Sequence, residues 1–223
     1  MSDSHNLPVR KIPASARSIT GTMPGGARFE STLERDLMYL LRFDLNVDKY
    51  IEQPVKIEYQ DKDGQQRSYT PDILIHHRKD ILPAKNIPSI LAEVKYRKEL
   101  RENFAEFRPK FKAAIHYAKE RGWKFKIFTD WEIRTPYLAN AKFLLGYKNP
   151  DTYPKYETVQ MVLDRVRELR ETDTGTLLAS IYSDKWNQAE LLPVIWHLIA
   201  IRKIGNDLSI PITMSSKIWH IKE

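Results

Sequence analysis

The sequence lacks several features that would identify large classes of protein. It has no cysteine, which excludes disulfide bonds and thiolate metal sites. It has no run of about 18 apolar residues, the length that a membrane span requires. Its first residues contain no apolar segment of the signal-peptide type, and no repeat or low-complexity tract is visible. We therefore expect a globular, cytoplasmic protein, and 223 residues with 42% hydrophobic content allow one large domain or two small ones.

Basic residues are in excess, but only in one part of the chain. The net charge is +7, and the residues up to Tyr153 contain 27 basic and 20 acidic side chains, against 9 of each after it. A basic domain favours a polyanionic partner, most simply nucleic acid, although the same charge also serves solubility alone.

Two short motifs contain residues suited to a divalent metal ion. In the first, Asp72 follows Pro71 directly before an apolar run, as at the start of a strand. In the second, Glu93 and Lys95 flank Val94, so strand alternation places both charged side chains on one face. If the two strands are neighbours, two carboxylates and one ammonium meet at one edge of a sheet. Magnesium takes oxygen ligands, and a lysine beside it can orient a water molecule or stabilise charge on a phosphate.

Together the two motifs match the Pro-Asp…Glu-x-Lys signature of restriction-endonuclease-like nucleases. Each motif is also common by itself, because Pro-Asp occurs in turns and Glu-x-Lys occurs on solvated surfaces. The surrounding sequence has to distinguish between these two interpretations.

The chain begins with a segment that has no apolar periodicity. Residues 1–27 are rich in Ser, Pro, Gly and basic residues, so we expect an extended basic arm along DNA or a partner, or a free tail. A helix is expected from Glu30, because leucines recur at helical spacing and Ser31 or Thr32 can begin it. Glu34 lies beside these leucines, where it either reaches a site next to the core or is an ordinary surface carboxylate.

Strands and helices then alternate. Val55 to Tyr59 and the turn at 61–64 predict a hairpin that leads into the Asp72 strand. After the Glu93 strand, a long helix is expected over about 99–121, with a kink or break at Pro109. Its expected apolar stripe comprises Leu100, Phe104, Phe107, Phe111, Ile115 and Ala118.

A strand over 124–129 and a short helix over 137–146 are expected to complete a nuclease domain at 28–150. Residues 151–223 differ in character. Helices are expected around 159–169, 177–181 and 187–204, followed by short strands at 208–213 and 218–221. Three helices and a hairpin predict a winged-helix domain, and the whole chain is of the α/β (α+β) class.

The chain resembles the TnsA family, the endonuclease subunits of heteromeric transposases such as those of Tn-seven-like and CRISPR-associated transposons. The resemblance covers about residues 10–146 in detail and the rest more loosely. It is carried by Phe29-Glu30-Ser31-x-Leu33-Glu34-Arg35-Asp36, Leu40-Leu41-x-Phe43-Asp44, Val47, Tyr50, Glu52-Gln53-Pro54, Tyr69-Thr70-Pro71-Asp72, Glu93-Val94-Lys95, Gly122-Trp123, Phe125 and Ile127.

The resemblance implies a restriction-endonuclease-like first domain with a metal-dependent DNA-cleaving site. Glu34, Asp72, Glu93 and Lys95 match the catalytic positions, with magnesium or manganese bound by the three carboxylates and the Val94 carbonyl. It also implies the partners TnsB, a transposase that cuts the 3′ ends, and TnsC, an ATP-dependent regulator. The TnsA-type subunit would cut the non-transferred strands near the 5′ ends of the transposon. A stand-alone restriction or repair nuclease and a non-catalytic DNA-binding adaptor are the alternatives.

The expected helix after the Glu93 strand is strongly basic. Residues 95–126 contain 11 basic and 4 acidic side chains. Four of the basic residues are spaced to form one stripe, which predicts a DNA-binding flank or simply a solvated face. They are Arg101, Arg108, Lys112 and Lys119. The DNA-binding candidates are Arg97, Lys98, Arg101, Arg108, Lys112 and Lys119.

The second domain has no excess of basic residues and is rich in tryptophan. Trp186, Trp196 and Trp219 lie in it, and each is either part of the core or part of a protein interface. We therefore expect residues from about Tyr156 onward to bind the regulator rather than to read a DNA groove.

Overall fold

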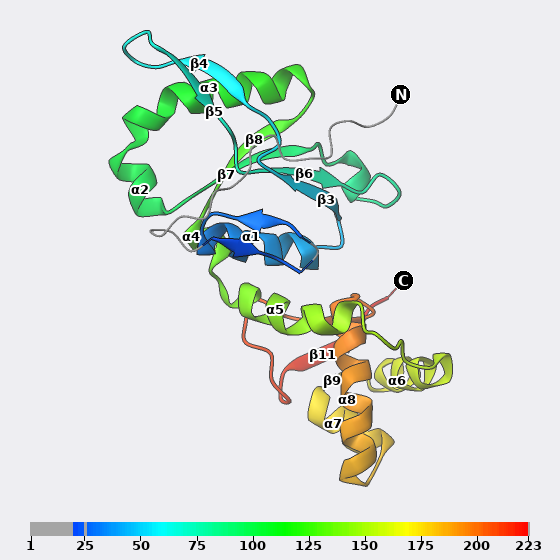
Figure 1. Ribbon diagram of the computed structural model, residues 1–223. Coiled ribbons are helices and arrows are strands. Elements are labelled where there is room, and N and C mark those ends of the chain that lie inside the picture. Colours follow the sequence, from blue (N-terminus) through cyan, green and yellow to red (C-terminus); the bar gives the residue numbers. More distant parts are fainter. Residues whose placement is uncertain (1–19, 25, 223) are drawn as a thin grey trace. The chain divides into compact units, whose positions relative to one another are not determined.

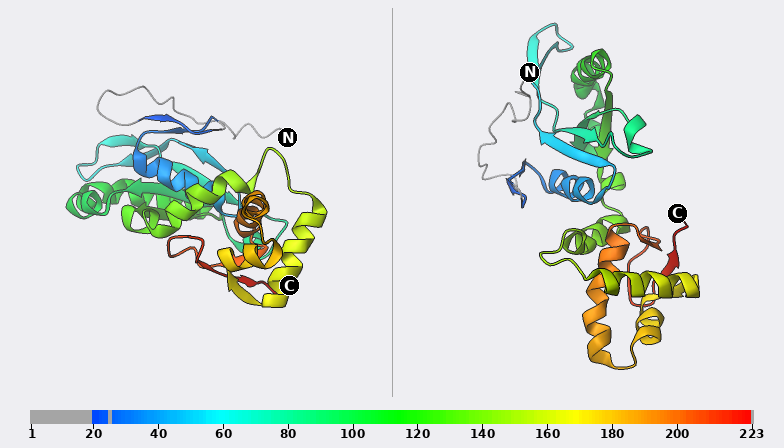
Figure 2. Two further views of the ribbon diagram at one scale, coloured as in Figure 1. Left: turned by 90° about the horizontal axis from the view of Figure 1, so that it is seen from below. Right: turned by 90° about the vertical axis from the view of Figure 1, so that its right-hand side faces the viewer.

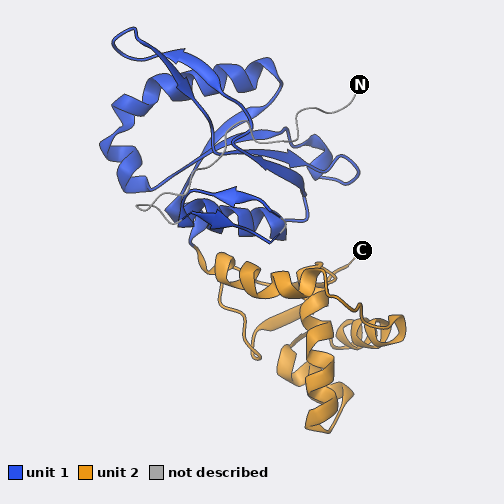
Figure 3. Ribbon diagram, viewed as in Figure 1, with its two compact units in different colours: residues 1–134 blue, residues 135–223 orange. Residues whose placement is uncertain are grey.

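The computed structural model describes residues 20–24 and 26–222 (Figure 1). Contacts between residues divide the chain into two compact units at Arg134 and Thr135 (Figure 3). No helix in these described ranges is long and apolar enough to cross a membrane. Each unit is described below by itself.

The first unit is built on a four-stranded sheet in the order β3-β6-β7-β8. β3 and β6 are antiparallel, as are β6 and β7, whereas β7 and β8 are parallel. A 3-10 turn at Ala84–Asn86 lies between β6 and β7. The strands are β3 (Val47–Glu52), β6 (Ile73–His77), β7 (Ile90–Lys95) and β8 (Lys124–Thr129).

Helix α1 (Thr32–Phe43) covers one face of this sheet, and helix α3 (Phe104–Glu120) covers the other (Figure 2). Leu33 and Leu37 of α1 pack with Ala92 and Val94 of β7. Leu91, which points the opposite way along the same strand, packs with α3. Strand β7 is therefore buried on both sides and forms the centre of the unit.

The hairpin also belongs to the α3 side. β4 (Ile57–Gln60) and β5 (Gln66–Tyr69) pair antiparallel, and Ile57 and Tyr69 join the core beneath α3. Asp61 forms the turn by accepting hydrogen bonds at 2.9 Å from the amides of Asp63 and Gln65. This is the local turn chemistry that the sequence predicts.

The second unit contains four helices and a three-stranded antiparallel sheet in the order β10-β11-β9. Helix α8 packs on α5, where Trp196 meets Phe143 edge-on at 5.5 Å between ring centroids. The elements are α5 (Pro136–Lys148), α6 (Tyr156–Leu169), β9 (Glu171–Asp173), α7 (Thr174–Ile181), α8 (Lys185–Ala200), β10 (Ile204–Asn206) and β11 (Lys217–His220).

Several sequence-based expectations need correction at the start of the chain. The basic arm expected over 1–27 falls partly outside the described residues, namely at 1–19 and 25. The remaining part is structured, because β1 (Gly21–Thr22) pairs with β2 (Arg28–Phe29) and Met23 is buried. The pattern of apolar residues did not indicate strand β3. It lies at the edge of the sheet, where charged residues are common. Its pairing with β6 shifts register between Val47 and Lys49.

The single long helix expected over 99–121 is two helices. α2 (Arg97–Glu102) and α3 meet at Asn103, whose side chain donates to the Glu99 carbonyl at 3.2 Å. Such local bonds compete with the helical ladder, whereas Pro109 lies inside α3 without ending it. The expected apolar stripe is only partly buried. Phe111 and Ala118 are buried as expected and Ala114 joins them, whereas Phe104 and Ile115 are exposed.

The second unit begins earlier than the boundary expected at residue 150. Helix α5 was expected to close the first domain, but its buried residues Leu138, Ala141 and Leu144 belong to a helix that packs on α8. The division after Arg134 follows from this packing.

The segment 208–213, which was expected to be a strand, is a loop. Asn140 of α5 holds this segment as a loop, donating to the carbonyls of Leu208 at 2.9 Å and Ile210 at 2.6 Å and accepting from the Ile212 amide at 3.0 Å. β10 instead forms at 204–206, where the third helix was expected to end. That helix is α8, which Asp184 caps and which begins at Lys185, two residues before the expected start.

Candidate active site

The register of β6 and β7 places the two motifs side by side. Ile73 pairs with Ala92, so Asp72 lies next to Glu93 at the edge where β6 begins. The Val94 amide donates to Asp72 Oδ2 at 2.6 Å. The two strands are therefore neighbours, as the hypothesis of a metal site requires, and their register brings the two carboxylates together.

The carboxylate of Glu93 is almost fully buried and has three protein partners. Lys95 Nζ and Lys110 Nζ both lie 3.2 Å from Oε1, while the Tyr69 hydroxyl donates to Oε2 at 2.5 Å. A carboxylate has about four lone-pair directions, so roughly one on Oε2 remains open. A buried carboxylate needs such partners, because desolvation without compensation is costly.

Two of these partners, Tyr69 and Lys110, are missed by sequence reasoning. Tyr69 ends β5 and belongs to the segment that precedes Asp72, but its spacing alone gives it no role. Lys110 comes from α3, and its ammonium lies 4.5 Å from the ring centroid of Phe107, 4.9 Å from Tyr69 and 5.3 Å from Phe111. Its flanking aromatic residues are the only sequence signal, and only the packing of α3 on β7 turns it toward Glu93.

Glu34 lies at the N-terminus of α1, in the third position after its cap Ser31. Its Oε2 accepts from the Glu30 amide at 2.8 Å, and its Oε1 accepts from the Ser31 hydroxyl at 2.9 Å. These bonds resemble a capping box, in which an early glutamate satisfies free backbone donors. Glu34 is thus close enough to raise the pKa of Asp72, while its own oxygens accept hydrogen bonds at the start of α1.

Burial and mutual repulsion affect the acidic groups of this cluster. Burial raises the pKa of Asp72 well above its usual range, and the adjacent Glu93 raises it further. Burial also raises the pKa of Glu34, against the lowering effect of its hydrogen bonds. Burial by itself lowers the pKa of Lys95, but Glu93 and Asp72 outweigh it and the net shift is upward.

A divalent cation fits the chemistry of this cluster. Three carboxylates (Glu34, Asp72 and Glu93) face two ammonium groups (Lys95 and Lys110), and a cation would favour the ionised form of Asp72. Within residues 20–24 and 26–222, however, no three acidic or histidine side chains are already arranged around one point. Asp72 and Glu93 are adjacent, whereas both oxygens of Glu34 accept hydrogen bonds at the start of its own helix.

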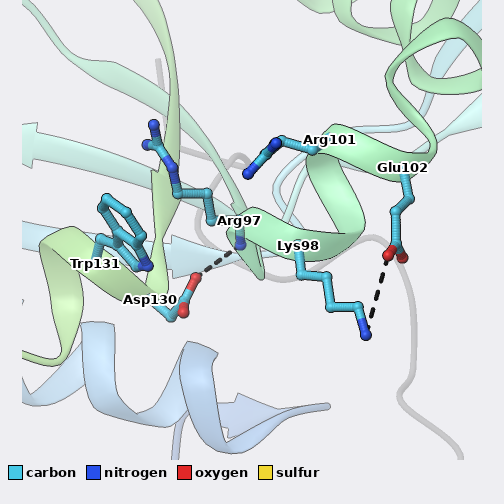
Figure 4. A pocket seen from close by; sticks show the side chains of 6 residues that line it. All are labelled: Arg97, Lys98, Arg101, Glu102, Asp130 and Trp131. Carbon is cyan, nitrogen blue, oxygen red and sulfur yellow. Dashed lines mark hydrogen bonds and ion pairs between the residues drawn. The ribbon is translucent and has the colours of Figure 1, made fainter.

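The predicted DNA-binding residues fall into two groups. Arg97, Lys98 and Arg101 lie on α2 and line a pocket together with Glu102, Asp130 and Trp131 (Figure 4). Arg108, Lys112 and Lys119 are exposed on α3. Because Asn103 separates the helices, the expected stripe of four is not continuous, and Arg101 belongs with the α2 group.

Family models match most of the chain. The model described as TnsA-like endonuclease N terminal matches residues 44–130, and the model described as TnsA endonuclease C terminal matches residues 132–208. Asp72, Glu93 and Lys95 lie inside the first match, whereas Glu34 precedes it. The comparison with curated proteins found no match.

Proposed function

This chain belongs to the TnsA family of endonucleases, and on that premise we propose that it cuts DNA as a transposase subunit. The proposed substrate is the non-transferred strand near each 5′ end of the transposon. The observation that carries the proposal is the pairing of β6 with β7, which sets Asp72, Glu93 and Lys95 together. The intact set of charged residues argues against a non-catalytic adaptor.

The architecture supports the finer fold assignments. A mixed sheet with α1 on one face and α3 on the other is consistent with a restriction-endonuclease-like domain. In the second unit, the order α6, β9, α7, α8, β10, β11 is consistent with a winged helix to which α5 is added.

In the proposed reaction the chain's own residues bind, orient and stabilise. Asp72, Glu93 and the Val94 carbonyl would hold magnesium, or manganese in its place, and Glu34 would join directly or through water. The ion would supply Lewis-acid activation of the scissile phosphate and of water. Lys95, whose Nζ lies 3.2 Å from both Glu93 and the Val94 carbonyl, would orient that water and stabilise charge on the phosphate. The products would be a 5′-phosphate and a 3′-hydroxyl.

The first experiment measures cleavage of an end-labelled transposon end in the presence of the partner transposase. Asp72→Ala, Glu93→Ala and Lys95→Ala should each lower the rate by a factor of at least about 100, since each removes a ligand or the charge beside it. A chelator should stop the reaction. Glu34→Ala should have a smaller effect, because its place can be taken by water.

Asp80→Ala is the matched control, since Asp80 is an exposed aspartate just beyond β6 that pairs with Arg78. It should cut at the wild-type rate. Wild-type activity of Asp72→Ala would place the site elsewhere. Efficient cutting by the purified chain without partners would instead favour a stand-alone nuclease.

We further propose that the second unit binds the ATP-dependent regulator TnsC, while transposon-end DNA and the transposase TnsB meet the first unit. The even balance of 9 basic and 9 acidic residues after Tyr153 supports protein docking over DNA binding. Trp186 is 76% exposed, as expected of an interface residue, whereas Trp196 is buried in the core.

A further inference from the structure

The pocket on α2 is placed beside the candidate active site by the pairing of two parallel strands. Lys95 at the end of β7 is in register with Thr129 at the end of β8. The next residues of both strands therefore emerge side by side, with Arg97 and Lys98 from one and Asp130 and Trp131 from the other. Arg97 follows Lys95 by two residues, which span at most about 7 Å.

This pocket has an exposed aromatic ring with cations around it. Trp131 is 69% exposed, and the Arg97 guanidinium lies over its ring at 4.4 Å from the centroid. Figure 4 shows Arg97, Arg101 and Trp131 around one open space, whose volume is about 490 Å³. That volume is within the range of ordinary ligand sites.

The acidic residues of the pocket already have partners. Asp130 accepts a hydrogen bond from the Arg97 amide at 2.7 Å, and Glu102 lies 4.0 Å from Lys98 Nζ. Across the described ranges, the Arg101 guanidinium makes no hydrogen bond or ion pair. The groups left for a ligand are thus the Arg101 guanidinium and the exposed part of the indole that the Arg97 guanidinium does not cover.

An indole flanked by guanidinium groups has the chemistry of a nucleobase-stacking site. Bases stack on aromatic rings irrespective of sequence, and nearby cations bind the backbone phosphates. We propose that this Trp131 pocket binds one unpaired nucleotide of the strand being cut, with its base stacked on the indole. This inference rests on the proposed endonuclease function, because it assumes that the ligand bound next to Lys95 is the DNA strand being cut.

The pocket lies close along the chain to the candidate active site, because Arg97 follows Lys95 by two residues. The nucleotide that it binds is therefore expected within a few steps of the scissile phosphate. A base within an intact duplex is already stacked and paired, and taking it out costs free energy. The pocket therefore favours DNA in which this nucleotide is mismatched, unpaired or single-stranded.

The test measures DNA binding by the full chain with fluorescence anisotropy, in a buffer that contains a chelator. The three probes are a short paired duplex, the same duplex with one unpaired 2-aminopurine nucleotide, and the single strand. Trp131→Ala should weaken binding to the second and third probes about tenfold, with little effect on the first. Trp131→Phe should retain most of the affinity, and the 2-aminopurine fluorescence should be quenched by the wild-type chain but not by Trp131→Ala.

Two further variants separate stacking from charge. Arg101→Ala should make the slope of log affinity against log salt shallower by about 0.9, the contribution of one phosphate contact, whereas Trp131→Ala should leave that slope unchanged. Trp186→Ala is the control for loss of an exposed tryptophan, because Trp186 is 76% exposed in the other unit.

Unchanged binding by Trp131→Ala, or an equal loss on all three probes, would overturn the inference. So would unchanged DNA binding together with lost capture of purified transposase, since the surface would then bind protein. The binding assay contains no metal, so it tests the pocket whether or not the chain cuts DNA. Absence of cleavage in magnesium would separately refute the proposed function.

Discussion

At the scale of single residues, Glu93 depends on side chains from three different elements. Lys95 comes from its own strand, Tyr69 from β5 and Lys110 from α3. Both ammonium groups bind the same oxygen, which leaves part of the other oxygen free. The orientation of this carboxylate is thus set partly by Lys95 of the Glu-x-Lys motif and partly by two residues outside it.

Lys110 is therefore expected to act as a positioning residue. Lys110→Met keeps the apolar stem among the aromatic rings but removes one of the two charges on Oε1. Loss of such an outer partner typically costs a factor of about 10 to 100, so the cleavage rate should fall by that amount while the chain stays folded. The measurement is the rate at increasing magnesium concentration, with circular dichroism to check folding.

Lys110→Arg should restore part of the rate, because it returns the charge. Lys85→Met serves as the control, since Lys85 is an exposed lysine of the same unit. A rate for Lys110→Met equal to that of the wild type at every magnesium concentration would show that Lys95 and Tyr69 are sufficient.

At the scale of elements, the local signals of the sequence were reliable at the start of α1 and at the hairpin turn, but they missed the local bond at Asn103 that divides the expected long helix. Ser31, one of the two candidates, caps α1, and Asp61 shapes the hairpin turn. Predictions failed where burial depends on a distant partner, as with the Phe104 and Ile115 side chains of α3. A helical stripe shows which residues share a face, but the neighbouring elements determine how much of that face is covered.

The exposed cations of α3 carry a prediction about DNA. Arg108 and Lys112 are one helical turn apart and both are exposed. Replacing both by alanine should weaken binding similarly for all DNA sequences. The slope of log affinity against log salt should become shallower by about two, because each phosphate contact contributes about 0.9.

The charge-matched control for this prediction is the Lys155→Ala, Lys203→Ala double variant. Both lysines are exposed in the second unit, which has no excess of basic residues. A salt slope that stays at the wild-type value in the α3 variant would mean that this face is only solvated.

At the scale of the whole molecule, the boundary between the units is a testable consequence of packing. A fragment of residues 1–134 should fold and unfold cooperatively, because it contains the complete sheet with α1 and α3. A fragment of residues 1–153 also carries α5, whose buried residues Leu138, Ala141 and Leu144 lose α8 as their cover. Exposed apolar surface of this kind favours self-association.

Size-exclusion chromatography and urea unfolding compare the two fragments. The shorter one is expected to be monomeric and the longer one to associate or to bind a hydrophobic dye. A longer fragment that is monomeric and more stable than the shorter one would restore the boundary at 150. Both fragments should fail to capture the regulator, while residues 135–223 should capture it.

The sequence by itself determined the residue types of the site, the spacing that puts Glu93 and Lys95 on one face, most helices and strands, and the family resemblance. These depend on backbone periodicity and short-range hydrogen bonds, which neighbouring residues specify. Only the tertiary structure decided that Lys110 and Tyr69 hold Glu93, that α5 belongs with α8, and that Trp131 lies beside Arg97. Each of these contacts joins residues whose proximity depends on strand register or on which face of a helix is covered, and neither follows from local spacing.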